Sequence, residues 1–515
     1  MSQGKLVGTI VEQPSGQPAP ARLYVTGSDG QRYYPAPSIP HPAKRELEGH
    51  VITLAKPFEI ALPAGKTVVR IERGPEFHPI QQVVEVPAEG VVEKRFELRR
   101  WSNLAAEGWY CGDLHVHRRL ADMHALLAAE DVHVAMPLTA WDNRPRDPDI
   151  EMFAQHATAQ GEVRVNERRL FTIYNQEYEP GRSPTGAVLL MGMNKHIDSR
   201  TAPPLEPIFD LAHQRGGFVD MEKHSWAWAP VVAAAGKCDV FEIANNHHWR
   251  EKCLYIDFEA PMHSLKAEYP ADIVGWTLYG FDSWYAYLNC GFRLAPIAGT
   301  ANGVHPNPLG HSRVYVNIAD PALPTTTRTE LTLRGWQRNM LAGRSFVTTG
   351  PLLLFEAGGR EPGDEIRSLG PTVVRCRVRL HSLAKPEQIE IVRGGAVVHS
   401  IRTDVKSDAD GVYRFDESVD LTVDSTTYLA ARAFVEPPSR DTVRFAHSGI
   451  VRVTVPAKPL LPRRFEVDHF IRRVESMIAE IREGKLKSGD PAAALAEYER
   501  ALLVYQRLAA RVRDS

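Results

Sequence analysis

Two histidines one residue apart offer the clearest chemistry in this chain of 515 residues. His115 and His117 close a largely apolar segment that starts at Trp109 and is typical of a short buried strand. Side chains alternate between the two faces of a strand, so both imidazoles point the same way. Two imidazoles on one face can bind one divalent metal ion. The alternative is a pair of surface histidines beside a turn, and further ligands decide between the two.

The central part of the chain supplies such ligands where its strands are expected to end. Strand-like and helix-like segments alternate between residues 101 and 355, which predicts a parallel α/β sheet or barrel. In β/α barrels the active-site residues gather at the C-terminal ends of the strands. Three or four ligands with one open position suit a catalytic metal ion. We expect the ligands to be His115, His117, Glu177, His224 and His247. The metal is a divalent ion, with zinc as the leading candidate and manganese and iron as alternatives.

Charged residues next to these ligands are candidates for catalysis. Asp142 could act as a general base, with Glu179 as a competing carboxylate. Lys223 and Arg118 could stabilise negative charge that develops in a transition state, or could simply neutralise nearby acids. Four tryptophans near these motifs could line a substrate cleft or belong to the core: Trp141, Trp226, Trp228 and Trp249.

Patterns outside the central region predict three further units. Residues 1–100 and 356–457 hold short strands separated by turns, which predicts a β-sandwich on each side, the second one Ig-like. The first resembles carboxypeptidase-regulatory-like modules. Residues 458–515 carry two apolar stripes at helical spacing, and Gly484 and Asp490 mark the turn between them. We expect a helical hairpin that packs on the body or on a second subunit of a homo-oligomer.

Composition narrows the class of partner and the compartment. The chain has 61 basic and 63 acidic residues, and this balance argues against a nucleic-acid or anionic-membrane partner. No apolar run reaches membrane-spanning length, and the first residues contain no hydrophobic signal segment. We expect a cytoplasmic protein, or a periplasmic or secreted one if a signal peptide has been removed. The five cysteines form no Cys-x-x-Cys pair, which argues against a zinc ribbon and a disulfide framework.

The segment Gly112-Asp113-Leu114-His115-Val116-His117 resembles the first motif of the PHP (polymerase and histidinol phosphatase) superfamily. More narrowly, residues 109–351 resemble the CehA/McbA-type metallohydrolases, the group that includes carbaryl hydrolases. The matching segments follow the family's order and lie at residues 129–135, 216–220, 288–294, 298–300, 310–316 and 343–351. The resemblance implies a distorted β/α barrel with divalent metal at its strand ends. It also implies hydrolysis of ester, phosphoester or carbamate bonds.

Two motifs of the superfamily are degraded in this chain. The second motif is usually Thr-Asp-His, but residues 138–143 contain no histidine. The last motif is Asp-x-His, and here residues 299–303 read Gly-Thr-Ala-Asn-Gly. The resemblance therefore implies a reduced site with one or two metal ions. His305 and His311 follow the last motif, either as replacement ligands or as members of a proline-rich loop.

These patterns lead to two hypotheses for function. The first is a hydrolase in which a metal-activated water attacks an ester, carbamate or phosphoester of a small-molecule or carbohydrate-like substrate. The second is a metal- or carbohydrate-binding relative without turnover, which the degraded motifs and the β-rich flanks favour. The amidohydrolase superfamily also begins with His-x-His, but its late catalytic aspartate is not evident here.

Overall fold

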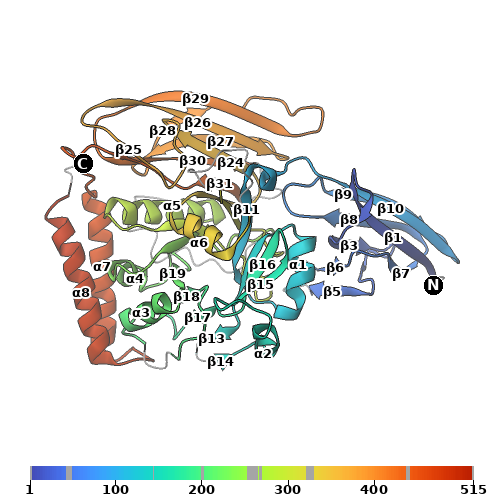
Figure 1. Ribbon diagram of the computed structural model, residues 1–515, viewed down its shortest axis with the longest axis horizontal. Coiled ribbons are helices and arrows are strands. Elements are labelled where there is room, and N and C mark those ends of the chain that lie inside the picture. Colours follow the sequence, from blue (N-terminus) through green and yellow to red (C-terminus); the bar gives the residue numbers. More distant parts are fainter. Residues whose placement is uncertain are drawn as a thin grey trace.

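Strands predominate in the structure, a computed structural model that describes residues 3–41, 49–142, 144–198, 202–251, 265, 269–319, 330–435 and 441–512. The fold is mixed α/β, as the sequence predicts, and the described residues form five sheets and eight α-helices. The N-terminal strands lie at one end of the molecule and the C-terminal helices at the other, with the α/β body between them (Figure 1). Among the described residues, no helix is long and apolar enough to cross a membrane.

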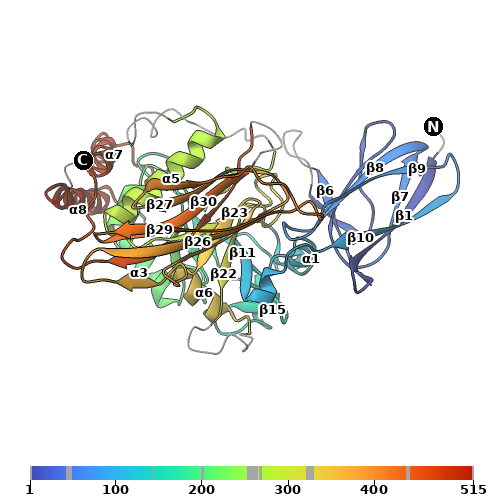
Figure 2. The ribbon, with the colours of Figure 1, turned by 90° about the horizontal axis from the view of Figure 1, so that it is seen from above.

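Two sheets make up the N-terminal region, which forms the right-hand end of the molecule in Figure 2. In the first, β1 (Gln3–Gln13) pairs with β10 (Val91–Arg99), β7 (Phe58–Pro63) and β2 (Gln17–Pro18). The second sheet consists of β3 (Arg22–Thr26), β4 (Arg32–Tyr33), β5 (Ser38–His41), β6 (His50–Thr53), β8 (Gly65–Glu72) and β9 (Ile80–Val86). Leu6, Leu23 and Phe96 belong to one apolar cluster that joins the two sheets. The short alternating strands expected for this region are therefore present.

Strands from two sheets of the body lie around a ring. β11 (Trp109–Val116) pairs with β12 (Val134–Pro137), and β13 (Ala140–Trp141) follows β12 along the chain without pairing with it. From β13 onward each strand pairs with the next, through β17 (Gln176–Tyr178), β18 (Val188–Met191), β19 (Phe218–Met221), β20 (Val240–Ala244) and β21 (Ala295–Ala298). The ring closes because a bridge joins Val116 to Asn302, just after β21. The pairs within the ring are parallel except that β18 is antiparallel to both of its neighbours. The predicted parallel arrangement therefore contains one antiparallel strand.

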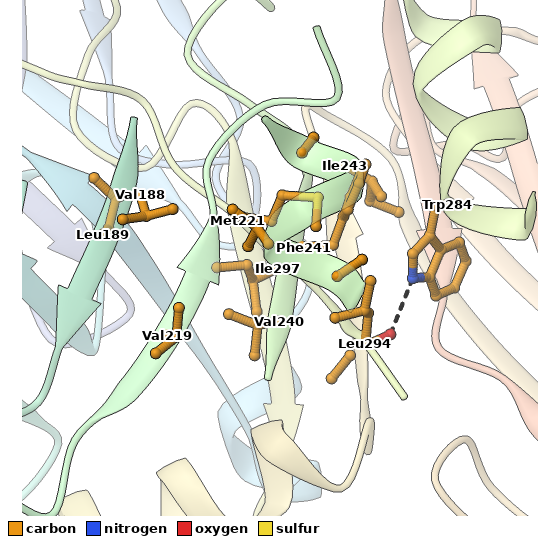
Figure 3. Close-up of a cluster of buried hydrophobic side chains, with 14 of the residues drawn as sticks. Val188, Leu189, Val219, Met221, Val240, Phe241, Ile243, Trp284, Leu294 and Ile297 are labelled. Carbon is orange, nitrogen blue, oxygen red and sulfur yellow. Dashed lines mark hydrogen bonds between the residues drawn. The ribbon is translucent and has the colours of Figure 1, made fainter. Parts of the chain in front are cut away.

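Helices cover the outside of these strands. They are α1 (Met123–Ala129), α2 (Ile150–Ala154), α3 (Glu206–Gln214), α4 (Ala229–Ala234), α5 (Ile273–Asn289) and α6 (Leu333–Leu341). Figure 3 shows how α5 packs: Phe241 and Ile243 of β20 point into an apolar cluster that also contains Trp284. The Trp284 indole N–H donates to the Leu294 carbonyl at 2.9 Å, which ties α5 to the start of β21. This cluster packs against β20 and β21, and β20 also carries one charged residue, Glu242.

A second, long sheet runs from the body into the C-terminal strands. Its order is β15 (Glu162–Asn166), β16 (Arg169–Thr172), β12, β11, β22 (Arg313–Asn317), β23 (Ser345–Thr348), β31 (Arg444–Ser448), β30 (Thr427–Val435), β27 (Pro386–Arg393) and β28 (Ala396–Ile401). β24 (Leu352–Ala357), β26 (Thr372–Ser382) and β29 (Tyr413–Val423) form a separate sheet that packs against it. Because β23 pairs with β31, strands from both sides of residue 355 share one sheet. The short strands β14 (Arg144–Pro145), β25 (Glu365–Arg367) and β32 (Val451–Thr454) extend the sheet edges.

The C-terminal residues form the expected helical hairpin, α7 (Arg464–Arg482) and α8 (Pro491–Ala509). The Asp490 carboxylate caps α8 by accepting the backbone N–H groups of Ala492 and Ala493. Two tyrosines of α8 anchor the hairpin to the body, since Tyr498 donates to the Pro184 carbonyl and Tyr505 to the Pro230 carbonyl. The hairpin therefore packs on its own chain, and association with a second copy stays a prediction.

The described cysteines are all free thiols, and they are Cys111, Cys238, Cys290 and Cys376. Cys253 lies outside the described residues. The absence of bridges among the described cysteines agrees with their scattered spacing in the sequence.

Candidate metal centre

Three potential ligand atoms converge where the end of β11 faces β17. The Nε2 atoms of His115 and His117 lie 3.2 Å apart, and His117 Nε2 lies 3.3 Å from Glu177 Oε2. Within the described ranges, this is the one group of three or more metal-ligating side chains whose ligand atoms all lie within 4.8 Å of one another. His115 is 1% exposed and Glu177 4%. Two imidazoles and a carboxylate are a donor set that fits a divalent ion such as zinc.

The strand register brings this set together. β13 and β17 are parallel, and Trp141 lies opposite Glu177 in their register. The Trp141 ring packs on the His117 imidazole with ring centroids 5.1 Å apart. The His117 backbone N–H donates to the Asn302 carbonyl at 2.7 Å, which holds the end of β11 against the loop after β21. Burial lowers the pKa of His117, so its ring is neutral at neutral pH, as metal binding requires.

Asp113 anchors the loop that carries the degraded last motif. Its Oδ1 accepts the backbone N–H groups of His115 and Thr300, and its Oδ2 accepts the Thr300 hydroxyl and the Gly310 N–H. Burial raises the pKa of Asp113 to about 6, although these hydrogen bonds oppose the shift. Residues 299–303 therefore serve to hold β11 in place.

The other two predicted ligands, His224 and His247, lie outside the three-residue group. The His224 ring packs on Trp276 with centroids 4.3 Å apart, and neither of its nitrogens has a hydrogen-bond partner in the described part of the chain. The His247 ring stacks on the same indole at 5.2 Å. Burial lowers the pKa of both imidazoles well below the usual value. Trp276 thus contacts both rings, and the two histidines form an aromatic layer with it.

Among the predicted catalytic residues, Lys223 interacts electrostatically with several buried groups near the candidate metal centre. Its Nζ lies 2.5 Å from Glu222 Oε1 and 4.6 Å from the centre of the Trp226 ring, and the residue is 8% exposed. The positive charge of Lys223 contributes, after burial, to the lowered pKa of His247 and of His305. The ammonium group is therefore a buried positive charge beside the imidazoles.

The other two predicted catalytic residues have mainly local contacts. Asp142 follows Trp141 with a φ of 53°, and its Oδ1 accepts the Glu179 backbone N–H at 3.0 Å. Arg118 donates to the Asp122 carboxylate at 3.0 Å and to the Pro40 carbonyl at 3.4 Å. In the described part of the chain, the hydrogen bonds of Arg118 therefore lead away from the three ligands. Asn143, the last residue of the degraded second motif, lies outside the described residues.

A layer of buried carboxylates lies next to His115 and was not predicted from the sequence. It consists of Asp220, Glu222 and Glu242, each fully buried. Glu242 Oε1 lies 3.3 Å and Glu222 Oε1 3.9 Å from His115 Nδ1. Burial raises the pKa of Asp220 and Glu242, and nearby carboxylates add to the shift. Burial opposes ionisation of Glu222 too, but Lys223 and His115 outweigh it and lower its pKa.

A sequence signal for this layer exists. Asp220 and Glu222 are two residues apart in an apolar strand context, the same spacing as His115 and His117. Alternate positions share one face of a strand, so two acids at this spacing point into the same interior. Acids in such a context rarely remain buried without a cation or a function.

His305, left between two roles by the sequence, lies among the same groups. Its Nδ1 accepts the Trp249 indole N–H at 3.1 Å, and its ring lies 5.9 Å from that of His247. Burial lowers the pKa of His305 to about 3, and Lys223 and His115 contribute. Because Nδ1 is an acceptor, the ring is neutral and carries its hydrogen on Nε2.

Comparison of the chain with models of known families, with curated proteins and with solved structures finds no match. The chemistry of the site is therefore argued from its residues.

Proposed function

We propose that this chain is a metal-dependent hydrolase of the PHP type, in which His115, His117 and Glu177 hold one divalent ion. The observation that carries the proposal is the convergence of these three ligand atoms within 4.8 Å at a buried strand end. The ring of strands, with helices outside it, supports a distorted β/α barrel flanked by two sandwiches. Zinc is the leading candidate for the ion because imidazole and carboxylate ligands suit it, with manganese and iron as alternatives.

The residues around the ligands support a hydrolytic reaction. When bound, a divalent ion supplies Lewis-acid charge and lowers the pKa of water to near neutrality. Lys223 supplies a buried positive charge that would stabilise negative charge developing on a carbonyl or phosphoryl oxygen. Trp141 and Trp226, which touch His117 and Lys223, offer apolar surface for an aryl or sugar ring.

Glu179 is a second carboxylate that could accept a proton. Burial raises its pKa to about 7, and Glu177 and Glu222 add to the shift. A general base is most effective when its pKa is near the working pH. Asp142, the base expected first, holds the Glu179 backbone N–H and so would fix the position of Glu179.

The test begins with protein purified without added metal. We expect elemental analysis to find about one divalent ion per chain in the natural protein and in His124→Ala, which changes an exposed histidine of α1. The double variant His115→Ala, His117→Ala should have lost the ion. A natural chain that contains no metal and takes up none would contradict the site.

The second stage is a screen of aryl esters, aryl carbamates and phosphoesters with zinc, manganese and iron. We expect hydrolysis of at least one class by the natural protein and none by the double variant. Metal-loaded protein that turns over none of these substrates would favour the alternative, a catalytically degenerate metal- or carbohydrate-binding relative.

A further inference from the structure

The imidazole of His115 faces two different groups with its two nitrogens. Its Nε2 lies 3.2 Å from His117 Nε2, on the side of the candidate metal centre. Its Nδ1 lies 3.3 Å from Glu242 Oε1, on the side of the buried carboxylates. A neutral imidazole carries hydrogen on one nitrogen only, and a metal ion needs the lone pair of the other. Whatever lies beside Nδ1 therefore decides whether Nε2 is free to bind metal.

Glu242 is the acceptor best placed for an Nδ1 hydrogen. Both of its carboxylate oxygens are buried, and in the described part of the chain neither has a hydrogen-bond partner. The Nδ1 and Oε1 atoms lie within hydrogen-bonding distance, although their geometry is not that of a hydrogen bond.

Glu222 is less suited to this task. Its Oε1 is 3.9 Å from His115 Nδ1 and already lies 2.5 Å from Lys223 Nζ. The same oxygen accepts from the Asn246 amide, and Oε2 accepts from the Trp226 indole. The charge and hydrogen-bonding capacity of Glu222 are therefore used by other groups.

The backbone of β20 and of the end of β21 places Glu242 next to His115. In β20, Glu242 lies between Phe241 and Ile243, so its side chain points to the opposite face of the strand from these two side chains. Gly299 lies against the pair, since a Cβ atom there would be 2.2 Å from His115 Cβ and 2.7 Å from Glu242 Oε1. The lack of a side chain at Gly299 lets the end of β21 close over the two groups.

We propose that Glu242 is a positioning residue that accepts the Nδ1 hydrogen of His115 and so presents Nε2 to the metal ion. This inference rests on the proposed metal centre. A carboxylate behind a histidine ligand fixes its tautomer and orientation, and loss of such a partner costs about 10- to 100-fold in metal affinity.

The test measures zinc affinity by competition with a chromophoric chelator, so it does not depend on finding a substrate. Glu242→Met and Glu242→Ala remove the acceptor, and we expect each to weaken zinc binding by about 10- to 100-fold. Glu242→Gln keeps a carbonyl acceptor and should stay within about 5-fold of the natural protein. Recovery by glutamine alone would point to hydrogen-bond acceptance, because a role in filling space would be met by methionine as well.

Asp220→Asn is the matched control. Asp220 is also fully buried, on the neighbouring strand β19, and it interacts electrostatically with Glu242, but no ion pair joins it to His115. We expect its zinc affinity to stay within about 2-fold of the natural value, because it lacks the outer-shell contact. Thermal unfolding of the metal-free variants checks that each one folds.

The outcomes separate this inference from the proposed function. A natural protein that binds no zinc contradicts the metal centre itself. A natural protein that binds zinc, with Glu242→Met and Glu242→Ala binding it equally well, contradicts the role of Glu242 alone. An equal loss in Asp220→Asn would also overturn it, since the effect would then belong to buried charge in general.

Discussion

Two buried charged regions of this molecule differ in how many of their charged groups are paired. Where the N-terminal sheet meets the body, Arg22 contacts Glu72 at 2.5 Å and Glu130 at 3.0 Å, and Arg250 contacts Glu72 at 2.5 Å. At the metal centre, several buried nitrogens and oxygens lack hydrogen-bond partners among the described residues. They belong to His115, Glu177, Asp220, His224 and Glu242.

The difference teaches what each region is for. Burying an ionised group costs several kcal/mol unless it is paired, so the charges of the first region form ion pairs that join two parts of the chain. Unsatisfied buried polar groups are rare in folded proteins and call for an explanation such as an ion or a catalytic role. The pairing of charges in the first region is that of a structural contact, and the unpaired groups of the second make it the candidate site for a bound ion.

The largest effect on stability should come from breaking the paired region. Arg22→Ala removes the guanidinium that lies 3.0 Å from the carboxylate of Glu130, which is 1% exposed. Removing one member of a buried pair costs about 3–5 kcal/mol. We expect a loss of that size in the free energy of unfolding, measured by urea titration, with zinc stoichiometry unchanged. A loss below about 1 kcal/mol would mean that these buried ion pairs do not stabilise the contact between the N-terminal sheet and the body.

The metal centre should show the reverse pattern. His117→Ala removes a ligand from the three-residue group. We expect zinc affinity to fall by more than the roughly 100-fold upper limit for loss of an outer-shell partner. The metal-free chain should keep its stability within about 1 kcal/mol, because the His117 ring takes part in no fully satisfied network. Zinc titration and urea titration of the same preparation measure both. Unchanged zinc affinity would remove His117 from the site.

Asp220→Asn should stabilise the metal-free chain, in a manner that depends on pH. Burial and the neighbouring carboxylates raise the pKa of Asp220 in the folded state well above its unfolded value. Its ionisation therefore costs the folded state nothing below the unfolded pKa, and the cost grows as the pH rises above it. We expect a gain in the free energy of unfolding at pH 8 and a smaller gain at pH 5. An equal gain at both values would show that the carboxylate does not titrate as described.

The smallest effect should come from an exposed pair of the same chemistry as the Arg22 network. Arg482 of α7 and Glu499 of α8 form an ion pair at 2.8 Å, with side chains 63% and 50% exposed. Exposed pairs contribute at most about 1 kcal/mol and often nothing measurable. Arg482→Ala should therefore change the melting temperature little. A loss as large as that of Arg22→Ala would mean that pairing, rather than burial, sets the difference.

The sequence predicts the ligands on the ring but not the groups behind them. His115, His117 and Glu177 can be found because each is close to the end of a predicted strand. The same logic selects His224 and His247, but Trp276 of α5 contacts both rings, and no local pattern shows where a distant helix packs. Glu242 lies inside a strand, so a search of the strand ends does not identify it as a site residue.

In the fold as well, local sequence patterns predict individual elements but not the pairing of strands that are distant in the chain. Short strands, caps and the helical hairpin follow from local patterns, as Asp490 at the start of α8 illustrates. The pairing of β23 with β31 joins segments far apart in the chain, and the antiparallel direction of β18 leaves no mark in a short apolar run. Both depend on tertiary packing.

The central claim is that His115, His117 and Glu177 bind one metal ion together. Anomalous diffraction from crystals of zinc-loaded protein, recorded at the zinc absorption edge, tests it most directly. The account predicts one strong peak about 2.0–2.2 Å from the Nε2 atoms of His115 and His117 and from a Glu177 carboxylate oxygen. The absence of a peak there, or a peak held by other side chains, would contradict it.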